Sequence, residues 1–212
     1  LALVSLIAAS YLLFTRLRST SLVDLILSSF VTVTGFVILS GYILSALKKI
    51  NRYEFWVGAC ILCFLLTMII IIIIDSRSSS TLIPTFHLRE KLRALVASMT
   101  YYQRLIFCPL VISFTSLAVI NLLVAIITVP NNVDGMTYHL ARLAYYIKQG
   151  SLSVFGANFW AQEVHPVNMT VIQIFSYVLS GGNENLTQLA NYFSYLVCVP
   201  LLDRKYRSLK LS

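Results

Sequence analysis

The sequence has little charge for a chain of 212 residues. Asp, Glu, Lys and Arg together make up 11% of it, whereas 58% is hydrophobic, and the mean hydropathy is +0.82. A soluble domain has about 25% charged residues, so this composition excludes one and predicts a polytopic integral membrane protein. Lys and Arg exceed the acidic residues, but they are scattered between apolar runs, as the positive-inside rule produces. We therefore predict no nucleic-acid partner.

Cysteine is also scarce, and its placement does not favour a metal or redox centre. All four cysteines lie within apolar runs, where a thiol is usually a small packing residue. The Cys-x-x-Cys at Cys60 and Cys63 has neither a second pair nor a histidine partner. The chain also has no internal repeat and no long linker, and nothing in it is typical of a removed targeting segment.

Long apolar runs divide the chain into predicted membrane spans. A helix needs about 20 residues to cross about 30 Å of hydrocarbon. Four runs have that length, namely 22–47, 55–74, 105–129 and 186–202, and a shorter run at 1–14 is interpreted as the remnant of a fifth span. The predicted fold is thus an all-α integral membrane protein with about five transmembrane helices, the first of them truncated, and an outer loop of interfacial amphipathic helices.

Two further segments are predicted to lie at the membrane surface. Residues 88–99 place apolar side chains on one helical stripe and arginines on another, which is typical of a surface helix. Residues 169–179 are apolar but too short to cross, which favours an interfacial or re-entrant helix. If this segment does not cross, most Lys and Arg residues lie on the cytoplasmic side, and the loop 130–185 lies outside. The basic cluster at 48–52 is the exception to the rule.

The outer loop 130–185 carries the densest polar constellation. It opens with an amphipathic helix that has an apolar stripe, while His139, Arg142 and Tyr146 follow on another face. Asp134 lies at the first turn of this helix, near the positive end of its dipole, which favours the ionised carboxylate. One interpretation of Asp134 is a helix cap. The other is a general base that takes a proton from an acceptor hydroxyl.

The other polar residues of the loop suit the second interpretation of Asp134. His139 and Arg142 can donate hydrogen bonds to a lipid phosphate, and Arg142 can do so with two nitrogens. The alternative for both is a solvated helix face, or for Arg142 a contact with lipid headgroups. Glu163 is a second carboxylate that can help to position the acceptor, or it is simply a solvated loop residue. The candidate contacts for a sugar or an acceptor are Tyr138, Gln162 and His165.

Three segments carry a resemblance to a known family. They read PNNVDGMTYHLARLAYYIKQGSLSVF, QEVHPVN and LSGGNENLTQLANYFSYL, and they fall within about a third of the chain, roughly 129–195. This pattern resembles a bacterial branch of the polytopic GT-C glycosyltransferases, related to the protein-mannosyltransferase and lipid A aminoarabinose transferase group. The chain departs from the branch at Gly135, where Ser is usual, at Val167, where a second Pro is usual, and at Asn183, where an acid is usual. The acid that commonly follows the proline motif is missing at 168–170.

The resemblance implies a transferase that takes a sugar from a polyprenyl-phosphate carrier on the outer face of the bacterial plasma membrane. The acceptor is a glycan, a lipid or a protein, and the presumed base is Asp134. Residues 1–104 then form the N-terminal transmembrane helices and the cytoplasmic surface helix, and 105–212 form the front part of the catalytic module. No cofactor is predicted with certainty, and participation of a divalent metal ion stays open.

Two rival functions follow from the same composition. A transporter or flippase for lipid-linked sugars is equally apolar, but it places polar groups inside its spans near the membrane midplane. A non-catalytic, truncated membrane fragment is the second rival, since relatives in the resembled branch have many more spans.

Overall fold

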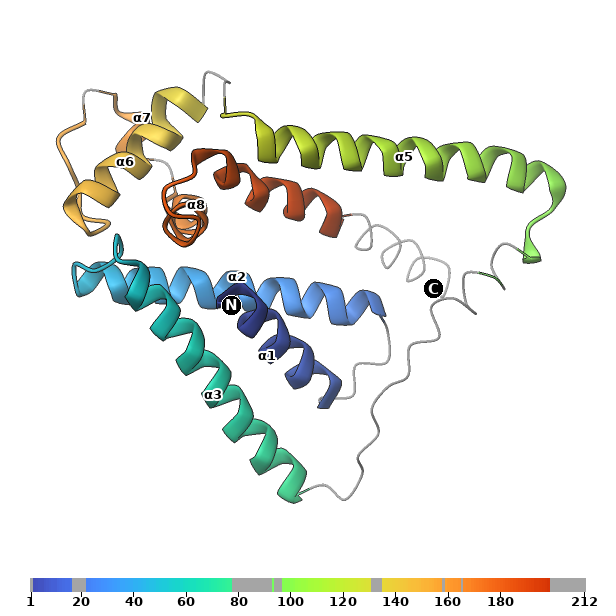
Figure 1. Ribbon diagram of the computed structural model, residues 1–212, viewed down its shortest axis with the longest axis horizontal. Coiled ribbons are helices and arrows are strands. Elements are labelled where there is room, and N and C mark those ends of the chain that lie inside the picture. Colours follow the sequence, from blue (N-terminus) through green and yellow to red (C-terminus); the bar gives the residue numbers. More distant parts are fainter. Residues whose placement is uncertain are drawn as a thin grey trace.

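The protein is described here by a computed structural model that covers residues 2–16, 22–77, 93, 97–130, 135–157, 159–164 and 166–198. In these ranges all regular secondary structure is helical (Figure 1). In chain order the elements are α1 (Ala2–Arg16), α2 (Leu22–Ala46), α3 (Tyr53–Arg77), α5 (Tyr101–Ile127), the π-helix η1 (Gly135–His139), α6 (Leu140–Gln149), α7 (Ala161–Val164), α8 (Asn168–Leu179), the 3-10 helix η2 (Glu184–Gln188), and helical residues 189–198.

Among the residues that the structure describes, three helices are long and apolar enough to cross a membrane. They contain the segments Val23–Ala46, Tyr53–Ile74 and Tyr101–Ile127, which confirms the predicted runs 22–47, 55–74 and 105–129 as helices of spanning length. The predicted span 186–202 is helical as far as residue 198 and then leaves the described range. The 15 residues of α1 are fewer than a span needs. The predicted surface helix at 88–99 lies largely outside the described residues.

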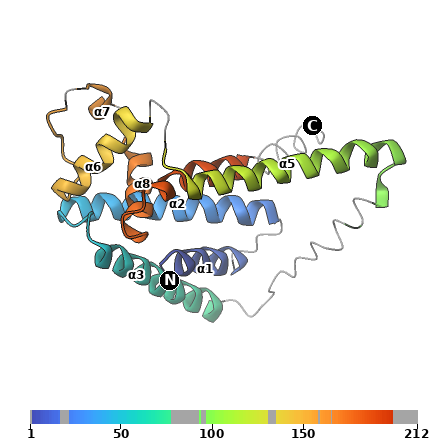
Figure 2. The same cartoon turned by 45° about the horizontal axis from the view of Figure 1, so that its top comes forward.

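The short helix α8 runs across the long helices. It has 12 residues, so it is too short to cross a bilayer. In Figure 1 it is seen end-on, whereas α2 and α5 lie in the plane of the picture. Its length and its crosswise course agree with the prediction that 169–179 does not span. Figures 1 and 2 both place α6 beside α8, with α7 near α6, and α1 and α3 on the opposite side of α2 from α5.

The main apolar core lies where α2, α3, α6 and α8 meet. Trp56 is buried at its centre, where its indole nitrogen donates to the carbonyl oxygen of Ile50 at 2.7 Å and its ring meets Phe175 edge-on at 5.3 Å. Gly41 lets α8 approach α2 closely, because a Cβ at position 41 would lie 2.2 Å from Val171 Cγ1. The core is therefore closely packed around the short helix α8 rather than between the long helices alone.

The turn between α2 and α3 is fastened to the end of α6. The amide of Ile50 donates to the carbonyl of Gly150 at 3.3 Å, and Asn51 Nδ2 donates to the carbonyl of Ile147 at 3.0 Å. Gly150 ends α6 with a φ of 70°, a left-handed conformation that glycine adopts without strain. The basic cluster at 48–52 and α6 therefore lie at the same end of the spans, as the predicted topology requires.

The C-terminal end of α5 is held by the segment that follows α8. Asn185 Nδ2 donates to the carbonyls of Ile126 and Ile127 at 3.0 and 3.1 Å. Gln188 Nε2 donates to the carbonyl of Thr128 at 2.8 Å, and the Tyr192 hydroxyl donates to the carbonyl of Ala118 at 3.1 Å. Helical residues 189–198 thus run alongside α5 (Figures 1 and 2).

Candidate functional site

The helix predicted to follow Asp134 is present. It begins as η1 at Gly135 and continues as α6 to Gln149. Asp134 itself lies outside the described residues, as do His165 and the side chain of Tyr138. The roles of Asp134, Tyr138 and His165 therefore stay predictions. The structure places side chains for the other candidates, which are His139, Arg142, Gln162 and Glu163.

The face of α6 that carries Arg142 is buried. Arg142 and Leu143 are 0% and 4% exposed, and Tyr146, one turn further on, is 3% exposed. The alternative of a solvated helix face is therefore wrong for Arg142, and Tyr146 is buried on the same face. The physical reason is tertiary, because α8, α7 and the loop between α6 and α7 cover this face. His139 is half-buried at the junction of η1 and α6.

Arg142 uses its guanidinium inside the protein. Nη1 donates to the carbonyl of Pro166 at 3.3 Å, and Nη2 donates to the carbonyl of Ala161 at 3.4 Å. Burial raises the pKa of the Tyr146 phenol above its usual value of 10, and the positive charge of Arg142 opposes part of that rise. A buried cation is thus held by backbone oxygens beside a phenol that stays neutral at physiological pH.

The segment 161–164 also hydrogen-bonds to η1, the first turn of the helix that continues as α6. Gln162 is almost fully buried, and its Nε2 donates to the carbonyl of Thr137 in η1 at 2.7 Å. Glu163 is exposed, and its Oε1 accepts a hydrogen bond from the amide of Ala157 at 3.1 Å. The structure thus brings Arg142, Gln162 and Glu163 into one corner of the molecule, although they come from segments about 20 residues apart.

Sequence reasoning missed a polar pair on α8. Thr170 and Gln173 are 0% and 6% exposed, and neither Thr170 Oγ1 nor Gln173 Oε1 has a hydrogen-bond partner among the residues that the structure describes. Their spacing of i and i+3 within an otherwise apolar segment is the signal that the sequence offered, since it puts both on one helix face. Asn168, at the start of α8, accepts a hydrogen bond from the Tyr42 hydroxyl at 3.0 Å.

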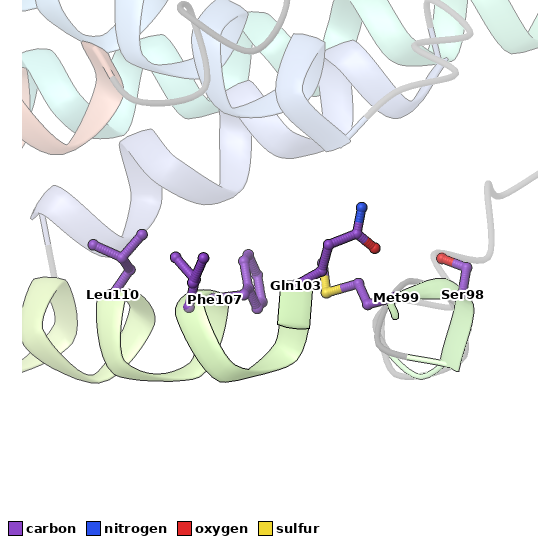
Figure 3. Close-up of a pocket in the computed structure, with 6 residues that line it drawn as sticks. Ser98, Met99, Gln103, Phe107 and Leu110 are labelled. Atoms are coloured by element: carbon purple, nitrogen blue, oxygen red, sulfur yellow. The ribbon is translucent and has the colours of Figure 1, made fainter. Parts of the chain in front are cut away.

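An open hollow at the start of α5 is a separate feature. Figure 3 shows its labelled lining residues, which belong to α5 and to the short stretch before it. It is lined by Ser98, Met99, Gln103, Ile106, Phe107 and Leu110. This end of α5 is the one far from α6, α7 and α8 (Figure 1), so the hollow does not belong to the candidate site. Over the described ranges, no three or more His, Cys, Asp or Glu residues cluster in a way that could hold a metal ion.

Comparison of the chain with protein-family models, with curated proteins and with solved structures gives no match. The described part of the chain is helical, with three helices that are long and apolar enough to cross a membrane. The short helices α6, α7 and α8 pack at one end of them.

Proposed function

We propose that this chain carries the front part of the catalytic module of a membrane glycosyltransferase of the GT-C type. In this proposal it moves a sugar from a polyprenyl-phosphate-linked donor to a glycan, lipid or protein acceptor, on the outer face of the bacterial inner membrane. The partners in this proposal are the donor, the acceptor and membrane lipid.

The observation that carries the proposal is the meeting of the three segments on which the resemblance rests. Hydrogen bonds from Arg142 and Gln162 join the segment after Asp134 to the segment 161–166. Hydrogen bonds from Asn185 and Gln188 join the third segment to the end of α5, directly before the first. Residues that contact one substrate must lie close together. These hydrogen bonds hold the first two segments against each other, and the third against the end of α5.

The proposed chemistry is a direct displacement with inversion. Asp134, as an ionised carboxylate, takes the proton of an acceptor hydroxyl while the hydroxyl oxygen forms a bond to the anomeric carbon of the sugar. The bond from that carbon to the phosphate oxygen breaks, and the electron pair leaves with the polyprenyl phosphate. In this scheme His139 meets the donor phosphate, and Tyr138, Glu163 and His165 meet the sugar and the acceptor. Arg142 and Gln162 hydrogen-bond backbone carbonyls and support these residues from within the protein.

The structure favours this proposal over a transporter. The acidic and basic residues of α2, α3 and α5 lie within the first or last turns, as with Asp24, Glu54 and Arg104. Coupled transport usually needs ionisable groups near the membrane midplane. The polar side chains of the candidate site instead gather at one end of the spans, where a lipid-borne headgroup would meet water.

The test is transfer of a radiolabelled sugar from defined polyprenyl-phosphate donors, with the protein in native membranes. We expect transfer by the wild type, and its loss with Asp134→Asn, while the amount of inserted protein stays the same. Asp24→Asn is the matched control, because it removes a carboxylate at the end of α2 that is far from the candidate site. This variant should leave transfer unchanged.

Two results would contradict the proposal in different ways. Wild-type turnover by Asp134→Asn would remove the assignment of the base. Absence of transfer by the wild type with every donor would remove the enzymatic function and favour a non-catalytic membrane fragment.

A further inference from the structure

The helix α7 is too short to keep its conformation alone. α7 has four residues, which is about one helical turn, and forming a single turn costs more conformational entropy than its hydrogen bonds return. Its carboxylate, Glu163, hydrogen-bonds within the neighbouring loop, to the amide of Ala157. Its position relative to α6 must therefore come from contacts with other parts of the protein.

Arg142, in α6, supplies one such contact. Its two terminal nitrogens reach carbonyls on either side of the turn, at Ala161 where α7 begins and at Pro166 just after α7 ends. A guanidinium has a rigid planar fork, so one side chain can fix two acceptors at a set separation. Because Arg142 is 0% exposed, water does not compete for these donors.

Gln162 supplies a second contact in the opposite direction. Its amide group leaves α7 and donates to the carbonyl of Thr137 in η1 at 2.7 Å. Arg142 of α6 thus donates to backbone carbonyls of Ala161 and Pro166, and Gln162 of α7 donates to a backbone carbonyl of η1. Together they hold α7 against the stretch of helix that directly follows Asp134.

We propose that Arg142 and Gln162 form a clamp that sets the distance between the segment after Asp134 and the segment that carries Glu163. Arg142 is then a positioning residue, which acts through the backbone of 161–166 and does not contact the donor phosphate. Gln162 has the same role and is not a contact for the sugar. The clamp itself does not depend on the proposed function, but its effect on sugar transfer rests on that function.

The first measurement is amide hydrogen exchange of residues 159–164 in the protein embedded in nanodiscs. We compare Arg142→Lys, which keeps the charge but loses the fork, with Gln162→Met, which keeps the length but loses the donor. Losing hydrogen bonds of this kind should speed local opening about tenfold. The control is Lys148→Met, which removes an exposed cation of the same helix and should leave exchange unchanged.

Retained folding is checked in the same experiment. Protection of residues 171–178 in α8 should stay as in the wild type, which shows that the core around Trp56 persists. Unchanged exchange of 159–164 in both Arg142→Lys and Gln162→Met overturns the clamp. Faster exchange in both variants, with α8 protected, establishes it.

The second measurement separates positioning from phosphate binding. If the wild type transfers sugar, the clamp predicts that Arg142→Lys lowers kcat by about tenfold or more while the KM for the donor changes little. A raised donor KM with unchanged exchange would make Arg142 a direct phosphate contact and overturn the inference. Should the wild type show no transfer, the proposed function fails, and the exchange result alone still decides the clamp.

Discussion

The helices α8 and α5 are both apolar, yet they differ sharply in what surrounds them. α8 has 12 residues and buries six of them, whereas α5 has 27 residues and buries only Ala125. In a bilayer, lipid chains solvate apolar side chains about as well as another helix does. The comparison teaches that apolar length determines which helix can cross the membrane, while side-chain packing determines which helix organises the protein.

The largest expected difference between the two helices concerns equivalent isoleucines. Ile174 in α8 is 0% exposed and Ile112 in α5 is 65% exposed. Ile174→Ala should lower the free energy of unfolding by about 2–5 kcal/mol, because it leaves a cavity in a closed core. Ile112→Ala should change it far less, because lipid fills the space. Unfolding of the reconstituted protein by a denaturing detergent measures both, and equal losses would break the comparison.

A second test uses two glycines of α2. A Cβ at Gly41 would overlap Val171 of α8, whereas a Cβ at Gly35 would meet nothing within 4 Å. We expect Gly41→Ala to destabilise the protein by about 1–3 kcal/mol through overpacking. Gly35→Ala should be neutral or slightly stabilising, since alanine is the better helix former. Thermal unfolding in nanodiscs separates the two, and a harmless Gly41→Ala would mean that α8 does not pack on α2 as described.

The smallest expected effect concerns the side of α5 that does have protein contacts. The Tyr192 hydroxyl donates to the carbonyl of Ala118, and Tyr195 is mostly exposed. Tyr192→Phe should cost about 0.5–1.5 kcal/mol, the usual net value of one hydrogen bond. Tyr195→Phe is its control and should cost nothing measurable. The same detergent titration reads both, and a loss in the control equal to that in Tyr192→Phe would contradict the assignment.

The spans could be predicted from the sequence because hydropathy reports directly on the lipid environment. The ends of the helices could not be predicted in this way, because a helix can continue through polar residues that a hydropathy-based span leaves out. For example, α5 begins at Tyr101, before the predicted run 105–129, because Thr100 and Gln103 form a capping box there. The short apolar run 169–179 also predicted a helix too short to cross a bilayer, and α8 has 12 residues.

The burial of Arg142 could not be predicted from sequence spacing. The spacing of His139, Arg142 and Tyr146 is the same whether their helix face contacts water or other parts of the protein. What buries it comes from elsewhere in the chain, including carbonyls that lie 19 and 24 residues further on. Thr170 and Gln173 were hidden for a similar reason, since two polar residues do not change the apolar average of their segment. The role of Asp134 stays a prediction.

We propose that the packed end of the molecule, with α6, α7 and α8, faces the outside of the cell. The most direct measurement is labelling of single cysteines in intact cells with a membrane-impermeant maleimide, after replacing the four native cysteines by serine. Val154→Cys lies in the exposed loop between α6 and α7, and Tyr102→Cys lies exposed at the start of α5. The account predicts that Val154→Cys is labelled at once and Tyr102→Cys only after permeabilisation, and the reverse pattern would contradict it.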